Sequence, residues 1–296
     1  MLIGLLGDVH GQVFHALALL LTWQARSGRS FDFIAQVGDM GAEPDGDLAD
    51  RPAYDRFGGD FARLLKATGP RAARLRRVRE ALGCPIHFLR GNHEDVAWLR
   101  GLPVDPASGT ARVDPFDLVR YVPDGAVLAA GGARDGGDLH RERTRIAFLG
   151  GVEERTDEAG IDAEAYAALS ALPTGSIDLL VAHEGHHGTS IGFRGDVHGS
   201  AMMTRLLERT VPAFFAFGHA HQRIGPARFG RTVYVGLQGL LPFRKWQPDA
   251  AGFVPGCLAI LDTRDGSLTP VTEPWLPAFP THPFDFDAWV DQFLGA

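Results

Sequence analysis

Short apolar runs alternate with segments of helical spacing along most of the chain. The runs that predict strands cover residues 2–6, 31–37, 85–89, 121–130, 145–150, 177–182, 213–217, 232–237 and 257–261. Helical spacing is found over residues 14–25, 61–82, 162–172, 200–209 and 284–294. We expect Pro70 to interrupt the second helix, because a proline inside a helix removes a hydrogen bond. Strands that alternate with helices predict an α/β protein, and the strand-rich second half predicts mixed sheets.

Five of the apolar runs end in a polar cluster. The clusters are Gly7-Asp8-Val9-His10-Gly11, Gly38-Asp39, Gly91-Asn92-His93-Glu94, His183-Glu184-Gly185 and Gly218-His219-Ala220-His221. Ligands of open α/β sheets bind beyond the carboxyl ends of the strands, so we expect these clusters to converge in space. Asp, Asn and His donors without Cys suit manganese, iron, zinc, cobalt or nickel, and there are enough donors for two ions.

The spacing of donors inside two of the clusters predicts how their side chains are arranged. An extended backbone would place Asp8 and His10 on one face, so that both side chains point at one ion. The same reading applies to His219 and His221, but a turn there would aim the two imidazoles at neighbouring ions. The flanking glycines allow sharp reversals and a close approach of the backbone to a ligand.

Composition narrows the class of protein. The chain has 296 residues, of which 45% are hydrophobic, and a net charge of -7. An acidic chain is a poor candidate for wrapping nucleic acid, which stays open as an enzyme substrate. Two cysteines, no signal-peptide pattern and no apolar run long enough for a bilayer predict a cytoplasmic protein without membrane contact. We find no linker or repeat and expect one domain over residues 1–296.

A helix rich in arginine follows the second cluster. Its basic residues are Arg71, Arg74, Arg76, Arg77 and Arg79. We expect them to form a solvated helix face, and the alternative is contact with a phosphate backbone.

The five clusters, in this order, resemble the motifs of the calcineurin-like metallophosphoesterases. The stretch from His183 to His221 looks more like the bacterial phosphodiesterase-like branch of this family. Each motif alone is weak, but five in order after apolar runs are a specific signal. The resemblance covers residues 8–221, about three quarters of the chain. It implies a four-layer αββα sandwich, with two mixed sheets face to face, helices outside and a dinuclear metal centre at one end.

The resemblance also implies a role for each donor. Seven side chains would bind two divalent ions, three to each ion and one to both: Asp8, His10 and His221; Asn92, His183 and His219; and the bridging Asp39. Manganese is the ion we expect first. His93 would lie beside the centre without binding metal.

Phosphoester hydrolysis follows from such a centre. Two ions roughly 3.5–4 Å apart clamp a phosphoryl oxygen and lower the pKa of a bridging water, and the resulting hydroxide attacks phosphorus. The carboxylate of Asp39 offsets the repulsion between the ions, and the neutral oxygen of Asn92 limits the negative charge near the substrate. His93 is expected to donate a hydrogen bond to phosphate or a proton to the leaving alkoxide.

Other polar residues near the motifs compete for roles. Arg90 is a candidate for binding a substrate phosphate oxygen, with a salt bridge as the equally weighted alternative. Glu94 is expected to orient its neighbours rather than bind metal. His186 and His187 are expected to line the rim or face solvent, because His183 directly ends the apolar run. A second Gly-Asp-Val-His-Gly, at residues 195–199, follows no apolar strand and is interpreted as a loop that matches by chance.

The residues after Asp39 bear on the substrate. They read Met40-Gly41-Ala42-Glu43, without the Arg-Gly of the Ser/Thr phosphatase branch. We therefore favour a phosphodiesterase acting on a nucleotide, a nucleic acid or another small phosphodiester. Residues 243–246, Phe-Arg-Lys-Trp, are candidates for stacking on a nucleotide, or an ordinary surface loop. The alternatives are a phosphomonoesterase or protein phosphatase, and a non-catalytic scaffold, which the complete donor set disfavours.

Overall fold

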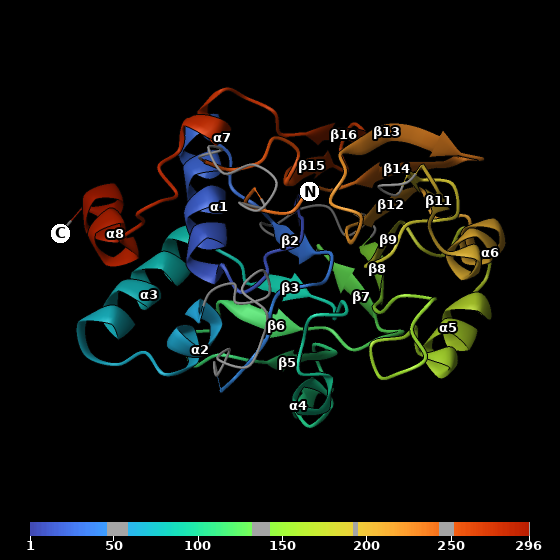
Figure 1. Ribbon diagram of the computed structural model, residues 1–296, viewed down its shortest axis with the longest axis horizontal. Coiled ribbons are helices and arrows are strands. Elements are labelled where there is room, and N and C mark those ends of the chain that lie inside the picture. Colours follow the sequence, from blue (N-terminus) through green and yellow to red (C-terminus); the bar gives the residue numbers. More distant parts are fainter. Residues whose placement is uncertain (46–58, 132–142, 192–194, 243–251, 296) are drawn as a thin grey trace, which may run out of the picture.

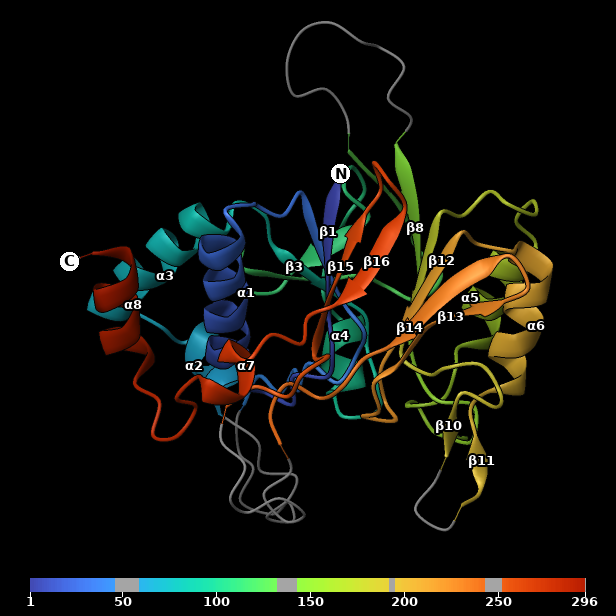
Figure 2. The same cartoon turned by 90° about the horizontal axis from the view of Figure 1, so that it is seen from above.

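Two β-sheets pack face to face, and helices cover the outer face of each (Figures 1 and 2). The structure is a computed structural model, and it describes residues 1–45, 59–131, 143–191, 195–242 and 252–295. Three separate apolar cores correspond to the three boundaries between the four layers. The predicted αββα sandwich is therefore confirmed, while the extent of a single domain stays a prediction.

The first sheet has eight strands. In spatial order they are β16 (Ser267–Pro270), β15 (Leu258–Asp262), β1 (Leu2–Leu6), β2 (Phe33–Gln36), β3 (Ile86–Phe88), β6 (Val119–Tyr121), β5 (Thr110–Arg112) and β4 (Val104–Asp105). The central strands β1, β2, β3 and β6 are parallel, and the flanking strands pair antiparallel. Every residue of β1 is buried, which explains its unbroken apolar sequence.

The second sheet has six strands. In order they are β13 (Ile224–Phe229), β14 (Thr232–Gly236), β12 (Phe214–Phe217), β9 (Leu179–Ala182), β8 (Thr144–Leu149) and β7 (Val127–Ala130). The four central strands are parallel, and β13 and β7 are antiparallel edges. A separate hairpin pairs β10 (Ser190–Ile191) with β11 (Val197–His198).

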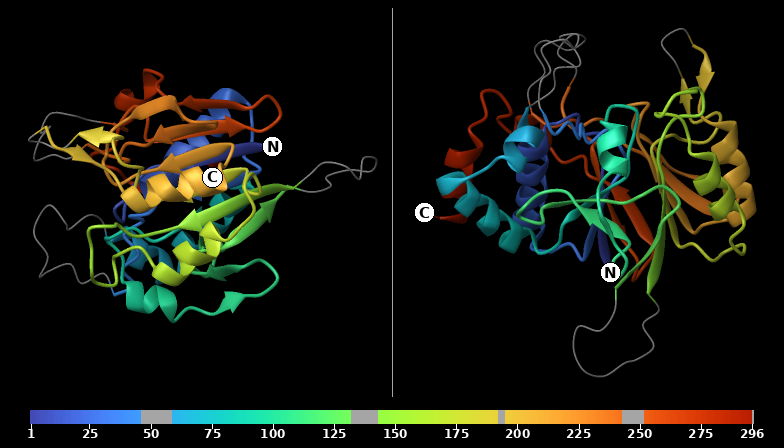
Figure 3. Two further views of the ribbon diagram at one scale, coloured as in Figure 1. Left: turned by 90° about the vertical axis from the view of Figure 1, so that its right-hand side faces the viewer. Right: turned by 90° about the horizontal axis from the view of Figure 1, so that it is seen from below.

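Helices form the two outer layers. The elements are α1 (Val13–Ser27), α2 (Asp60–Leu65), α3 (Gly69–Leu82), α4 (Val96–Arg100), α5 (Ala163–Ser170), α6 (Ala201–Thr210), α7 (Trp275–Ala278) and α8 (Phe286–Leu294). Helices α1, α3 and α8 lie outside the first sheet, and α5 and α6 cover the second (Figures 2 and 3). No described helix has the length and apolarity needed to cross a membrane.

The predicted strand over residues 121–130 is wrong. The segment contributes β6 to the first sheet and β7 to the second, with Pro123-Asp124-Gly125 between them. Gly125 has a φ of 80°, a left-handed conformation that glycine adopts without strain. This turn carries the chain from one sheet to the other. The expected interruption near Pro70 is confirmed, because α2 ends at Leu65 and α3 begins at Gly69.

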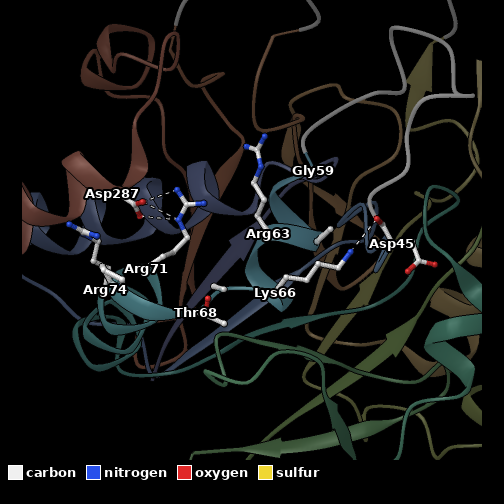
Figure 4. A pocket seen from close by; sticks show the side chains of 11 residues that line it. Asp45, Gly59, Arg63, Lys66, Thr68, Arg71, Arg74 and Asp287 are labelled. Atoms are coloured by element: carbon white, nitrogen blue, oxygen red, sulfur yellow. Dashed lines mark hydrogen bonds and ion pairs between the residues drawn. The ribbon is translucent and has the colours of Figure 1, made fainter.

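The arginines of α3 do not form a simple solvated face. Arg71 donates to Asp287 of α8 at 2.7 Å, and Arg74 forms an ion pair with Asp291. A surface cavity of about 750 Å³ lies beside them, and Figure 4 shows Arg71 turned toward Asp287 and Lys66 toward Asp45. These ion pairs join α3 to the C-terminal helix, and they offset the positive charge of the cavity.

We expect His87 to make the protein acid-sensitive. Its ring stacks on Phe33 with centroids 4.2 Å apart, and burial lowers its pKa to about 4, although a hydrogen bond to the Ile34 carbonyl opposes the shift. The unfolded chain takes up this proton near pH 6.5, so stability that is present above pH 6.5 is lost between pH 6.5 and 4. A shift of this size corresponds to about 3 kcal/mol.

His87→Phe should remove this part of the acid sensitivity. Urea unfolding at pH 7.5 and at pH 4.5 measures the difference, and His198→Phe, a change at an exposed histidine of β11, is the control. If the His87→Phe protein loses as much free energy of unfolding between these pH values as the unchanged protein, the assignment is wrong.

Candidate metal centre

The five polar clusters meet at one end of the sandwich. Three of them follow β1, β2 and β3 of the first sheet, and two follow β9 and β12 of the second. Because these strands are parallel within their sheets, their carboxyl ends open onto the same edge. Figure 2 shows β1 running from the N-terminus toward this edge, on which the hairpin of β10 and β11 also lies.

A first group of donors combines both sheets. Ligand atoms of Asp8, His10, Asp39 and His221 all lie within 4.8 Å of one another. The Nε2 atom of His221 is 2.8 Å from Asp8 Oδ2 and 3.0 Å from His10 Nε2. This is the set predicted for the first ion.

A second group shares Asp39 with the first. Ligand atoms of Asp39, His183 and His219 lie within 4.8 Å of one another. Asn92 Oδ1 is 3.0 Å from His183 Nε2, which itself is 3.4 Å from Asp39 Oδ1. All seven predicted donors are thus brought together in the predicted grouping.

Four of the donors have left-handed backbones. His10, Asp39, His219 and His221 have φ values of 47°, 53°, 61° and 48°, and they account for four of the six non-glycine residues with positive φ in the described chain. Such conformations cost about 1–3 kcal/mol each and cluster at functional sites. The expected extended backbone across Asp8 and His10 is therefore wrong, and the turn considered for His219 and His221 is confirmed.

Glycines of the motifs leave room for the donors. An added Cβ at Gly91 would collide with Asp39 Oδ1, and one at Gly218 would collide with Asp8 Oδ1. A Cβ at Gly38 would lie 2.5 Å from His183 Nδ1. The lack of a side chain at these glycines therefore leaves space for the donor atoms, in addition to allowing turns.

Hydrogen bonds orient the donors from behind. His183 Nδ1 donates to the Val37 carbonyl at 2.9 Å, so Nε2 is the ring nitrogen that faces the site. Asp39 Oδ1 accepts from the backbone N–H groups of Asn92 and His93, at 2.8 and 3.0 Å. Asp8 Oδ2 accepts from the N–H of His219 at 3.0 Å.

Asp39 and Glu94, two of the buried carboxyl groups near the centre, have opposite pKa shifts. Burial raises the pKa of Asp39, but the surrounding imidazoles, above all His183 and His10, outweigh burial and hold it well below its usual value. Burial, and then the charge of Asp39, raise the pKa of Glu94 well above its usual value. Glu94 accepts from the Gly91 N–H at 2.7 Å, so it orients the third motif as expected.

The pKa values of three imidazoles in the donor groups are also shifted. Burial lowers the pKa of His10, and burial together with His183 lowers that of His219 to about 4. Burial acts in the same direction on His221, but the charge and hydrogen bond of Asp8 outweigh it, so the pKa of His221 is raised. At neutral pH the neutral forms of His10 and His219 are ready to bind metal.

The donor set fits divalent cations. Asp8 Oδ1 is buried and has no hydrogen-bond partner among the described residues. His183 Nε2 and Asn92 Oδ1 face each other at 3.0 Å, and both atoms could bind the same cation. Buried acceptors that converge in this way are costly unless a positive charge satisfies them.

His93 lies beside the first group. Its ring is 5.4 Å from the ring of His10, measured between centroids, in an edge-to-face arrangement. Its backbone N–H is held by Asp39, which places the side chain next to the centre and outside both donor groups.

Arg90 does not face the substrate. Its side chain is fully buried and forms an ion pair with Asp124, with Nε and Oδ2 2.5 Å apart. The expectation that it holds a phosphate oxygen is therefore wrong, and the salt-bridge alternative is right. Burying a guanidinium requires a paired charge and satisfied donors, and both are found behind the motif.

Two supporting residues escaped the sequence analysis. Gln36 donates to the Gly7 carbonyl at 3.2 Å and accepts from the Gly38 N–H at 3.1 Å, so it links the first two motifs. The sequence feature that could have identified Gln36 is a polar residue inside an apolar run. For Asp124 the sequence shows only a Pro-Asp-Gly turn.

The competing residues lie outside both donor groups. His186 is buried against Phe229 and Tyr234 rather than on the rim, with centroids 4.6 and 4.9 Å apart. His187 is exposed, as are Asp196 and His198 in the second Gly-Asp-Val-His-Gly, where β11 replaces the expected loop. Residues 243–246 lie outside the described residues.

Solved structures that resemble this chain share little of its sequence. The solved structures include a crystal structure that superposes with a TM-score of 0.51, at 12% identity, over 92% of this chain and 98% of that chain. A dimetal phosphatase from Danio rerio gives a TM-score of 0.47, at 14% identity, over 88% and 91%. A predicted phosphoesterase from Streptococcus pneumoniae TIGR4 gives 0.33, at 13% identity, over 93% and 94%.

The family itself is shown by the sequence. No curated protein sequence matches the chain. The family model described as calcineurin-like phosphoesterase matches residues 1–223, about three quarters of the chain. The protein therefore belongs to the calcineurin-like phosphoesterase family and is a metal-dependent hydrolase of phosphoester bonds.

Proposed function

We propose that the protein hydrolyses phosphodiesters at a dinuclear centre. The observation that carries this proposal is that two groups of donors share the single carboxylate of Asp39. Asp8, His10 and His221 would hold one ion with Asp39, and Asn92, His183 and His219 would hold the other. When bound, a pair of divalent ions, manganese in the first place, polarises a phosphoryl oxygen and lowers the pKa of water.

The protein supplies orientation and charge. The pKa of Asp39 is well below its usual value, so Asp39 is ionised at neutral pH and brings a full negative charge to the point where both ions would meet. The N–H groups of Asn92 and His93 fix the direction of its Oδ1 atom. The low pKa of His219 keeps its ring neutral, whereas the raised pKa of His221 means that a proton competes more strongly with metal for that ring.

His93 is the group we propose as proton donor. It is next to the centre, and its ring is not part of either donor group. A proton given to the leaving oxygen prevents an unstable alkoxide from forming, a contribution of typically 10²–10⁴-fold in rate.

The preference for diesters is supported by charge. A phosphomonoester carries up to two negative charges, and a diester carries one. Arg90, which immediately precedes the third motif, is buried against Asp124 and is turned away from the site. The five motifs themselves contain no lysine or arginine that could bind the extra charge of a monoester. A nucleotide, a nucleic acid or another small phosphodiester fits this class of substrate.

We expect bis-p-nitrophenyl phosphate to be hydrolysed with a kcat/KM at least about tenfold higher than p-nitrophenyl phosphate, which is about 1.4 kcal/mol of transition-state stabilisation. Initial rates with added Mn²⁺, and with Zn²⁺, Co²⁺ and Ni²⁺ in parallel, measure the ratio. A higher kcat/KM for the monoester would instead support a phosphomonoesterase, and no turnover with any ion would support the scaffold.

We further propose that the protein works in a reducing compartment, the cytoplasm. Cys84 and Cys257 are the two cysteines of the chain, and they form no disulfide. Burial raises the pKa of Cys257 to about 12, so its thiol is chemically quiet. This location supports substrates of the nucleotide and nucleic acid class.

A further inference from the structure

A buried ion pair joins the two sheets directly behind the third motif. Arg90 immediately precedes Gly91 and Asn92, and its side chain has no exposed surface. Its partner Asp124 lies in the turn that carries the chain from β6 in the first sheet to β7 in the second. The pair therefore lies where the two sheets meet.

All three guanidinium nitrogens of Arg90 are used. Nε donates to Asp124 Oδ2 at 2.5 Å, and the two terminal nitrogens donate to the carbonyls of Glu158 and Gly160, at 3.0 and 2.7 Å. The other oxygen of Asp124 accepts from the N–H of Gly150 at 2.7 Å. A planar fork makes these contacts at once, whereas a lysine ammonium on its single stem does not reproduce the arrangement.

The backbone is also in close contact here. The N–H of Gly151 donates to the Arg90 carbonyl at 3.3 Å, and an added Cβ at Gly150 would collide with that carbonyl. Gly150 directly follows Leu149, the last residue of β8. The carbonyl of Leu149 accepts a hydrogen bond from the N–H of His183 at 3.2 Å. A short path of contacts thus connects Arg90 to His183.

The strand order places this contact nearer to one donor group than to the other. The backbone contact between Arg90 and Gly151 joins the end of β3 to the end of β8. On the side of the metal centre, β3 is next to β2 in the first sheet and β8 is next to β9 in the second. Asn92 follows β3 itself and His183 follows β9, the neighbour of β8, whereas Asp8 follows β1, two strands from β3, and His221 follows β12, two strands from β8. His219, the remaining donor of the second group, also follows β12. Among the donors assigned to a single ion, Asn92 and His183 are therefore the two nearest to the ion pair in strand order.

We propose that Arg90, through its ion pair with Asp124, is a positioning residue for the second ion. It sets the separation across the sheets between Asn92 and His183, whose facing atoms are 3.0 Å apart. This inference rests on the dinuclear centre of the proposed function. Residues that orient metal ligands from outside change metal affinity by about 10–100-fold when they are replaced.

The test measures bound metal rather than turnover. Mn²⁺ is titrated into the metal-free full-length protein and followed by elemental analysis after gel filtration and by electron paramagnetic resonance, which separates spin-coupled pairs from isolated ions. The variants are Arg90→Met, Arg90→Lys and Asp124→Asn. Arg74→Met is the matched control, because Arg74 also pairs with an aspartate but on α3, outside the metal centre.

We expect the unchanged protein and Arg74→Met to hold a spin-coupled pair. Arg90→Met should show one isolated ion, with affinity for the other lowered by about 10–100-fold. Arg90→Lys, which keeps the charge, and Asp124→Asn, which keeps the shape, should show smaller losses of the same ion. If Arg90→Met does not fold, these two variants decide the matter.

Double variants identify the ion that is lost. Adding Asn92→Ala to Arg90→Met should change little, because both weaken the same ion, whereas adding His221→Ala should remove both ions. The inference is overturned if the Arg90 and Asp124 variants keep the coupled pair with unchanged affinity, or lose both ions together. If the unchanged protein itself holds no pair, the proposed dinuclear function fails instead.

Discussion

Asp39→Asn is expected to cost the protein its bound metal and at least about a thousandfold in kcat, which corresponds to about 4 kcal/mol. Asp39 is the residue common to both donor groups, so its replacement weakens both at once. The variant removes a negative charge from a fully buried position surrounded by imidazoles, while the side chain keeps its size. Without that charge, two divalent ions in neighbouring positions repel each other with little to offset the repulsion.

Elemental analysis and initial rates with bis-p-nitrophenyl phosphate measure the two effects. Asp287→Asn is the matched control, because it removes an aspartate that pairs with Arg71 on the surface of α3 and should leave metal content and kcat unchanged. Retention of both ions by the Asp39→Asn protein would refute the bridging role.

His93→Ala is expected to lower kcat for alkyl phosphodiesters by about 10²–10⁴-fold while the metal content stays intact. The ring lies beside the centre and outside both donor groups, so its removal takes away a proton donor without taking away a ligand. A nitrophenolate leaves without help, whereas an alkoxide must be protonated. The loss in kcat should therefore be small for aryl diesters and large for alkyl diesters.

A comparison of aryl and alkyl phosphodiesters on the same protein separates two roles for His93. His198→Ala, at an exposed position on β11, is the control for the loss of an imidazole and should leave both rates unchanged. Survival of activity on both substrates would show that His93 is not needed. An equal loss on both would assign it to binding the phosphate rather than to proton transfer.

The local pattern of apolar residues was sufficient to predict the central strands, but it predicted the edge strands poorly. Strands such as β1 and β9 are buried on both faces, so their sequences are continuously apolar and easily recognised. The edge strand β13 was missed because its side chains are largely exposed or half-buried, and its sequence includes a glycine and a proline. The segment 121–130 misled because its apolar residues serve two different sheets.

The sequence by itself determined which donors exist, in what order, and that each follows a buried strand, because apolar runs and motif residues are local properties of the chain. Only the tertiary structure showed how these donors lie in space, with His221 close to Asp8 and His219 close to His183 across a left-handed turn. The burial of the Arg90 side chain was also decided by the tertiary structure alone. Its partners Asp124 and Gly160 lie 34 and 70 residues away, and a contact over such separations leaves no trace in the residues next to it.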